Sequence, residues 1–302
     1  MKAPAFAYVR PKRITEVLAL LEKHGDDARL LAGGQTLLAT LNMRLSEPAL
    51  LIDMQSVHEL KGLSVNGSTL RIGAMVTHSQ IESSPLVTQH APLLTRAAPH
   101  IAHRAIRNLG TFGGSIAYGD PAAEWPACLL ALDGTVIARS LQGERRIAAN
   151  DFFTGLYTTA LAANEVIVAC EIPLATRVHR FAFDELVRRH GDYAVVGLAA
   201  AGQWNDGTLD QLRLAWIGVG STPFRSTKTE QLLQGQPVTD ELLALAIEAL
   251  RAELQPESDL AHSVAAKRHL AGVMLKRCMT ALREQTSSRN PETVCPPLQG
   301  RP

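Results

Sequence analysis

The chain has 302 residues, a length typical of two folded domains of ordinary size. Hydrophobic residues make up 46% of the chain and charged residues 20%, which is the balance of a globular protein with sizeable cores. Lys and Arg (30) nearly balance Asp and Glu (29), and aromatic residues are only 5%, which argues against a nucleic-acid binder with a basic face or base-stacking platforms.

Short apolar strands and helices alternate in the first half of the chain. Apolar residues at helical spacing predict a helix over residues 14–21, which Gly25 terminates. Asn66-Gly67 lies between two apolar runs and predicts a hairpin. The other elements expected here are strands at 30–32, 50–52, 135–138 and 165–172 and helices at 92–98 and 125–132. Because Pro173 ends the last strand, we expect residues 1–173 to form one α+β unit.

The second half places strands before helices. Strands are expected at 180–187, 194–204 and 209–219, and helices at 240–254 and 264–283. This order predicts a smaller α+β domain over residues 178–285, with an antiparallel sheet and helices on one face. Residues 286–302 are rich in proline and show no periodicity, which predicts a disordered tail.

Targeting and metal-binding signals are missing. No apolar run reaches the roughly 18 to 20 residues of a membrane span, and the charged first 13 residues lack the apolar segment of a signal peptide. The sequence therefore predicts a cytoplasmic protein. The cysteines lie far apart, so neither a zinc nor an iron–sulfur site is expected, and we predict no metal ligands; the cysteines are Cys128, Cys170, Cys278 and Cys295.

Two glycine-rich segments are candidates for phosphate binding. Two adjacent glycines after a strand allow close approach to the backbone, and successive amides in such a turn attract an anion. The first segment comprises Leu31, Ala32, Gly33, Gly34, Gln35, Thr36 and Leu37. The second follows Ile106-Arg107-Asn108 and contains Gly110, Thr111, Gly113, Gly114 and Ser115. Each alone could be an ordinary turn, whereas the two together favour a diphosphate held between them.

Two further segments carry polar or aromatic candidates. In Asp120-Pro121-Ala122-Ala123-Glu124, Asp120 is interpreted as the N-cap of a helix that begins at Pro121. Glu124 could accept hydrogen bonds from ribose or ribityl hydroxyls. The segment 188–193 is either a charged turn or a platform on which Tyr193 stacks against a planar cofactor; the alternative for Tyr193 is a place in the core.

In this order and spacing, the four segments resemble the FAD-binding medium subunit of molybdenum hydroxylases, the xanthine dehydrogenase and carbon monoxide dehydrogenase family. Arg188-Arg189-His190-Gly191-Asp192-Tyr193-Ala194 is similar to the family pattern R-R-x-G-D-aromatic-A. The resemblance implies a two-part FAD-binding domain of the vanillyl-alcohol-oxidase (PCMH) type, with parts at about 1–56 and 57–173. A smaller α+β flavoprotein domain at 178–285 would follow.

The resemblance also implies where FAD binds. Its diphosphate would lie between the two glycine segments, and the flavin rather than a catalytic side chain would carry the chemistry. The remaining implied contacts are Ile101 with the dinucleotide, Asp120 or Glu124 with sugar or ribityl hydroxyls, Ile167 with the adenine end, and Tyr193, beside Asp192, with the isoalloxazine.

Partners are implied as well. A small subunit with [2Fe–2S] clusters would supply electrons, a large molybdopterin subunit would oxidise the substrate, and NAD, a quinone, oxygen or another external acceptor would receive the electrons. The implied assembly is a dimer of heterotrimers.

The sequence departs from the family in two places. The segment 183–187 lacks the lysine that related chains often carry, and Glu124 stands where several relatives have Asp. Two alternatives remain: a stand-alone FAD-dependent reductase similar to the cell-wall enolpyruvyl reductases, and an interaction subunit that has lost FAD.

Overall fold

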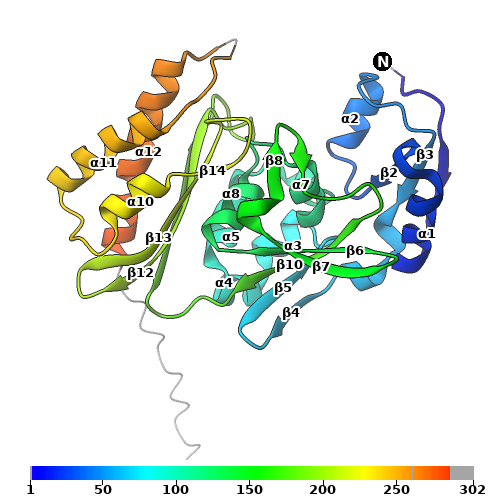
Figure 1. Ribbon diagram of the computed structural model, residues 1–302, viewed down its shortest axis with the longest axis horizontal. Coiled ribbons are helices and arrows are strands. Elements are labelled where there is room, and N and C mark those ends of the chain that lie inside the picture. Colours follow the sequence, from blue (N-terminus) through cyan, green and yellow to red (C-terminus); the bar gives the residue numbers. More distant parts are fainter. Residues whose placement is uncertain (1, 260, 286–302) are drawn as a thin grey trace, which may run out of the picture.

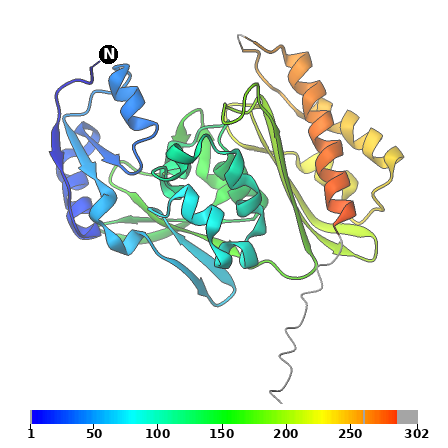
Figure 2. The ribbon, with the colours of Figure 1, turned by 180° about the vertical axis from the view of Figure 1, so that it is seen from behind.

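The computed structural model describes residues 2–259 and 261–285, and the predicted tail at 286–302 lies outside this range. Of the four sheets in these residues, the three larger ones follow one another along the long axis of the molecule (Figure 1). Figure 2 shows the same order from behind, with the N-terminal sheet at one end and the C-terminal helices at the other. Among the helices of these residues, none combines the length and apolar character that crossing a bilayer requires.

The N-terminal sheet has three parallel strands in the order β1-β3-β2. Its core comes from the predicted first helix, whose buried Ile14, Val17, Leu18 and Leu21 share one face. The elements are β1 (Ala7–Val9), α1 (Ile14–His24), the 3₁₀ helix η1 (Gly25–Asp27), β2 (Ala28–Leu31), α2 (Leu37–Asn42) and β3 (Leu50–Asp53).

The central sheet is antiparallel, with strand order β4-β5-β10-β6-β7. The predicted hairpin is present as β4 and β5, with Asn66 paired to Thr69. Its strands are β4 (Leu63–Asn66), β5 (Thr69–Gly73), β6 (Thr135–Ser140), β7 (Gly143–Ala148) and β10 (Val166–Pro173). Short helices and a two-stranded antiparallel sheet complete this part of the chain. The helices are η2 (Met54–Ser56), η3 (His58–Leu60), α3 (His78–Ser83), α4 (Pro85–His90), α5 (Pro92–Ala97), η4 (Ala98–His100), α6 (Arg104–Arg107), α7 (Phe112–Tyr118), α8 (Glu124–Ala131) and α9 (Ala149–Phe152), and the strands of the small sheet are β8 (Phe153–Gly155) and β9 (Thr158–Thr159).

The C-terminal sheet is antiparallel and covered on both faces. Helices α10 to α12 lie against one face, and central helices including α5 and α8 lie on the side of the other (Figure 1). Alternation along β12 explains this: Leu198 and Ala200 belong to the core under the C-terminal helices, while Ala199 and Ala201 belong to the central core. The elements are β11 (His179–Leu186), β12 (Val196–Asn205), β13 (Thr208–Ile217), β14 (Phe224–Arg225), α10 (Thr227–Leu233), α11 (Asp240–Glu253) and α12 (Val264–Glu284).

Candidate functional site

The first glycine loop joins β2 to α2 and presents unused backbone amides. Gly34 has a φ of 71°, which a residue with a side chain rarely adopts. Within the described part of the chain, four successive amide groups donate no hydrogen bond; they belong to Gly33, Gly34, Gln35 and Thr36. Adjacent unpaired amides form a concave site with positive potential. This loop therefore fits the diphosphate of a dinucleotide.

The fold brings the second glycine loop directly against the first. A Cβ atom added to Gly33 would overlap the carbonyl oxygen of Leu109 and lie 2.7 Å from Cα of Gly110. A Cβ atom added to Gly114 would lie 3.4 Å from Cβ of Ala32. The predicted juxtaposition of the two loops is thus present, and it depends on backbone approach that only glycine permits.

The second loop differs from the first because its amides are already engaged. Phe112 N–H donates to the Val76 carbonyl and Gly113 N–H to the Ala74 carbonyl, each at 2.9 Å. Gly114 N–H donates to Oγ1 of Thr111, the N-cap of α7. This loop can therefore offer hydroxyl groups and close backbone approach to a cofactor, while the amide cluster belongs to the first loop alone.

A buried histidine supports the second loop from behind. Nε1 of Trp125 donates to Nδ1 of His78 at 2.8 Å, and His78 N–H donates to the Gly110 carbonyl. Burial, aided by the charge of Arg107, lowers the pKa of His78 to about 4. The ring is therefore neutral near pH 7. Because Nδ1 accepts a hydrogen bond, the ring proton sits on Nε2, on the side of Gly110.

Arg107, from the second motif, holds the turn that contains Ile101. Its guanidinium donates to the carbonyl oxygens of Ile101 (3.0 Å) and Ala102 (3.1 Å) and pairs with Glu82. Ala102 has a φ of 43°, so this turn needs such support. The side chain of Ile101 is buried.

The interpretation of Asp120 as the N-cap of a helix beginning at Pro121 was wrong. The helix α8 begins at Glu124, and its N-cap is Ala123. The Asp120 carboxylate instead accepts a hydrogen bond from Ala122 N–H at 2.9 Å, which forms a local turn. Burial raises the pKa of Asp120. The turn moves the helix start three residues later and brings Glu124 to the first position of α8.

The loop 188–193 rests on the turn that Arg107 holds. Gly191 has a φ of 80°, and a Cβ atom there would lie 2.9 Å from Cε1 of His103 and 3.0 Å from the Ala102 carbonyl oxygen. The Asp192 carboxylate accepts from Tyr193 N–H and faces Arg188 at 3.7 Å. The loop 188–193 therefore contacts the backbone of the turn that Arg107 supports, just before the second glycine segment.

Tyr193 lies outside the core, because 65% of its surface is exposed. Burial of the hydroxyl raises its pKa, and Asp120, Tyr118, Tyr157 and Glu124 raise it further. The rings of Tyr118 and Tyr157 lie 5.0 Å apart between centroids. Tyr193 is thus an exposed aromatic side chain near two acidic groups and two other tyrosines, and the sequence did not single out Tyr118 or Tyr157.

Other candidates lie elsewhere. Ile167 is buried in β10 opposite Ala138, and no hydrogen bond in the described part of the chain joins it to either glycine loop. His100 and His103, which the sequence places three residues apart, do not share a helix, because η4 ends at His100 and α6 begins at Arg104.

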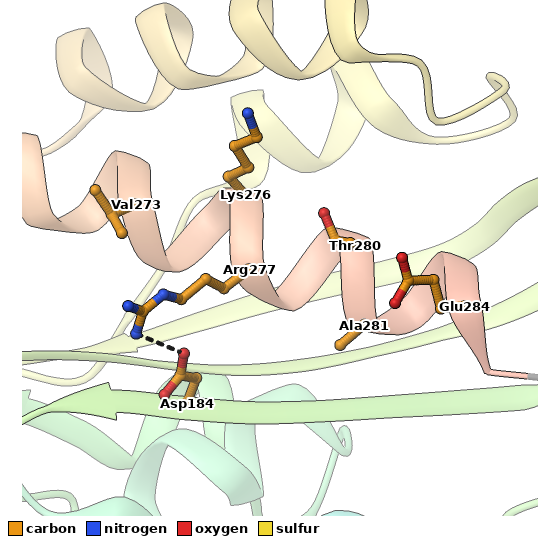
Figure 3. Close-up of a pocket in the computed structure, with 7 residues that line it drawn as sticks. All are labelled: Asp184, Val273, Lys276, Arg277, Thr280, Ala281 and Glu284. Carbon is orange, nitrogen blue, oxygen red and sulfur yellow. Dashed lines mark hydrogen bonds and ion pairs between the residues drawn. The ribbon is translucent and has the colours of Figure 1, made fainter.

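No group of three potential metal ligands occurs in residues 2–259 and 261–285. A surface hollow between β11 and α12 contains none of the predicted site residues (Figure 3).

Glu124 makes the stability of the chain depend on pH. Burial raises its pKa from 4.5 to about 8, and the charges of Glu185 and Asp120 add to this. At a pH between 4.5 and about 8, the folded chain keeps the proton of Glu124 while the unfolded chain has lost it. The free energy that Glu124 contributes to stability therefore falls as the pH rises through this range. We expect Glu124→Gln to raise the free energy of unfolding of the FAD-free chain at pH about 8.5. This gain should exceed the effect of the same substitution at pH about 5 by on the order of 2 kcal/mol. Urea unfolding at both pH values measures this difference.

The exposed Glu257 provides the control, since Glu257→Gln removes a carboxylate without touching the site. Equal effects of Glu124→Gln at the two pH values would contradict a raised pKa at Glu124.

Two domain families match this chain. Residues 4–175 match the FAD binding domain in molybdopterin dehydrogenase, and residues 181–282 match the CO dehydrogenase flavoprotein C-terminal domain. The chain is 40% identical to the nicotine 6-hydroxylase medium subunit of Paenarthrobacter nicotinovorans over 269 residues, covering 89% of this chain and 94% of that one. It is 37% identical to the carbon monoxide dehydrogenase medium chain of Hydrogenophaga pseudoflava over 281 residues, or 93% and 98% of the two chains.

Solved structures agree with these similarities. A chain of the Hydrogenophaga pseudoflava carbon monoxide dehydrogenase superposes with a TM-score of 0.91 at 38% identity, covering 93% of this chain and 98% of the other. A chain of quinoline 2-oxidoreductase from Pseudomonas putida 86 gives a TM-score of 0.89 at 37% identity, with 94% and 98% covered.

Proposed function

The chain belongs to the family of FAD-binding medium subunits of molybdenum hydroxylases, and from this premise we propose that it carries electrons from an iron–sulfur partner through FAD to an external acceptor. FAD is its cofactor, and the chain is an oxidoreductase subunit. The predicted fold class, a two-part FAD-binding domain followed by an α+β C-terminal domain, is confirmed. The observation that carries the proposal is the contact between the two glycine loops, beside four unused amides.

Each part of the site has a role in the proposal. The first loop binds the diphosphate through its amides, and the second supplies the hydroxyls of Thr111 and Ser115. Asp120 or Glu124 accepts hydrogen bonds from sugar or ribityl hydroxyls, and Tyr193, beside Asp192, covers the isoalloxazine. The bound flavin supplies electron transfer, while the protein supplies position and electrostatics. Ile101 and Ile167 contact the dinucleotide in this proposal, and the two domains span residues 1–173 and 178–285.

The proposed partners are a small subunit with [2Fe–2S] clusters and a large molybdopterin subunit, assembled as a dimer of heterotrimers in the cytoplasm. The acceptor is NAD, a quinone, oxygen or another carrier. Support comes from relatives that are called medium subunits and match over almost their full length. The same similarity disfavours the stand-alone reductase.

Co-expression with the products of adjacent reading frames tests the assembly. We expect a tagged chain to bring down iron and molybdenum and to release noncovalent FAD on acid precipitation. A chain that stays colourless after FAD reconstitution, or one that binds FAD but brings down no iron, would contradict the proposal.

Tyr193 offers a test of the isoalloxazine position. We expect Tyr193→Ala to weaken FAD binding about tenfold, to shift flavin absorption and fluorescence and to slow reoxidation, because the stacking ring is lost. Tyr193→Phe keeps the ring and should resemble the wild type. Since Tyr193 is 65% exposed, its truncation should cost little stability. A lowered Tm with unchanged flavin spectrum and reoxidation would show that the ring serves packing instead.

A further inference from the structure

A second hollow, which we call the interdomain hollow, lies where the C-terminal sheet meets the end of α8. Its volume is about 230 Å³, which is more than a single water needs and enough for a small organic molecule. One side is formed by the residues after α8 and by the link after β10, and the other side by β11, β12 and β13. None of the residues that we assign to the FAD site lines this hollow, so it is a separate feature of the chain.

Apolar side chains line part of the interdomain hollow. Phe181 and Ala201 are directly opposite each other in the pairing of β11 with β12, so their side chains point to the same face of the sheet. Leu132, after α8, and Leu174, in the link, complete this apolar lining. Phe181, Ala201 and Leu132 are buried. The lining suits the hydrocarbon part of a small ligand.

An ion pair in the interdomain hollow joins the C-terminal sheet to the end of α8. Nη2 of Arg213, on β13, donates to Oδ2 of Asp133 at 2.9 Å. This hydrogen bond uses one of the five N–H donors of the guanidinium. The side chain of Asp133 is 50% exposed and that of Arg213 is 25% exposed, so a ligand can reach both charges. The hollow therefore presents one positive and one negative charge side by side.

A β-bulge adds a further polar side chain to the hollow. Between Ala201 and Gln203, a single residue of β12 faces two residues of β13, and Gln211 is one of these two. Gln211 has a φ of 48°, and its Oε1 accepts a hydrogen bond from Nε2 of Gln203 at 3.1 Å. Asp133 has a φ of 55°. Two of the six non-glycine residues with positive φ in the described part of the chain thus line this hollow, and such strained backbone is typical of ligand sites.

His179 contributes a neutral ring to the same hollow. Thr176 N–H donates to Nδ1 of His179 at 2.9 Å, so the ring proton is on Nε2. Burial, aided by the charge of Arg213, lowers the pKa of His179, so the ring is uncharged near pH 7. The charges of Arg213 and Asp133 therefore balance, and the hollow as a whole has no excess charge that would select a simple anion or cation.

We propose that the interdomain hollow binds a small α-amino acid. The carboxylate of the amino acid accepts hydrogen bonds from the Arg213 guanidinium, whose planar donors fit a carboxylate, and the ammonium group pairs with Asp133. The side chain of the amino acid lies against the apolar lining. A single carbon separates the two charged groups of an α-amino acid, which suits an arginine and an aspartate in direct contact.

The neighbouring charges explain why the ligand is a zwitterion. A ligand with a carboxylate alone would place it beside the Asp133 carboxylate, and one with an ammonium alone would place it beside the Arg213 guanidinium. A zwitterion satisfies both charges at once. This inference does not rest on the proposed function, because the hollow contains none of the residues assigned to FAD.

Isothermal titration calorimetry of the full chain with glycine, L-alanine and L-valine tests the proposal. We expect L-valine to bind with a Kd on the order of 1 mM. Two analogues each lack one charge of valine: 3-methylbutanoate has no ammonium group, and isobutylamine has no carboxylate. Both should bind at least about tenfold more weakly than L-valine. Binding of either analogue as tight as that of L-valine, or no binding of the three amino acids up to about 50 mM, would overturn the proposal.

Variants of the ion pair locate the binding. Arg213→Gln should weaken L-valine binding at least about tenfold. Asp133→Asn, which keeps the size of the side chain, should weaken L-valine binding about tenfold without weakening 3-methylbutanoate binding, because only the ammonium group loses its partner. Circular dichroism confirms that each variant is folded.

Arg139→Gln is the matched control, since it breaks an ion pair with Glu144 on the central sheet and should leave L-valine binding unchanged. Wild-type affinity for L-valine in folded Arg213→Gln and Asp133→Asn, or an equal loss in Arg139→Gln, would overturn the site. A chain that binds L-valine as expected but takes up no FAD would contradict the proposed function and leave this site in place.

Discussion

Gly33→Ala should reduce FAD affinity about 100-fold or more while the chain remains folded. The added methyl group would overlap the Leu109 carbonyl and press on Cα of Gly110, so the two glycine loops must separate. Overpacking of this kind costs about 1 to 3 kcal/mol, and 2.7 kcal/mol corresponds to about a 100-fold loss of affinity. Fluorescence titration with FAD measures the affinity, and circular dichroism confirms the fold.

Gly62→Ala is the matched control, since a Cβ atom at Gly62 would have no neighbour within 4 Å and its φ is ordinary. We expect its FAD affinity to equal that of the wild type. If folded Gly33→Ala bound FAD as tightly as Gly62→Ala, the loop contact would not form the cofactor site.

His78→Ala should lower the free energy of unfolding by about 3 kcal/mol and also weaken FAD binding. The substitution leaves a cavity and removes the acceptor of the Trp125 indole N–H, which is fully buried. The His78 ring also packs against Gly110, so the substitution removes a contact that holds the second glycine loop in place. Denaturant unfolding without FAD measures the first effect, and FAD titration measures the second.

His90→Ala serves as the control, because His90 is at the end of α4 and only partly buried. A second variant, Trp125→Phe, keeps an aromatic ring but removes the N–H together with part of the fully buried indole, so it should also lower the free energy of unfolding. A stability of His78→Ala equal to the wild type would show that the His78–Trp125 hydrogen bond contributes nothing.

The helices and strands of eight or more residues were all predicted, because each depends on a local pattern, whereas many of the shorter ones were not. The helix α1 combines helical apolar spacing with a terminal glycine, and the β4–β5 hairpin has an Asn-Gly turn. The strand β7 could not be predicted, because Gly143–Ala148 is mostly polar and Ile147 is its only buried residue. This segment is a strand because it pairs with β6. The short helix α10 was missed for a similar reason, because it depends on contacts with another element. Its buried Glu230 accepts a hydrogen bond from the Leu214 amide and pairs with Arg225, and both residues belong to the adjoining sheet.

The candidate site divides in the same way. Residues such as Gly33 and Gly114 could be predicted from the sequence, because closely spaced glycines indicate positions where the backbone leaves no room for a side chain. The start of α8 was misplaced because Asp120 satisfies Ala122 locally instead of capping a helix.

By itself, the sequence determined the strand and helix periodicities, the glycine positions and the resemblance to medium subunits, because these are properties of neighbouring residues. Only the tertiary structure decided which glycine loop keeps its amides free, since that depends on whether Val76 and Ala74 accept the hydrogen bonds of the second loop. It also decided that Tyr193 lies outside the core and that Glu124 lies where burial raises its pKa. Burial and electrostatic interaction are fixed by distances in space, which local sequence does not encode.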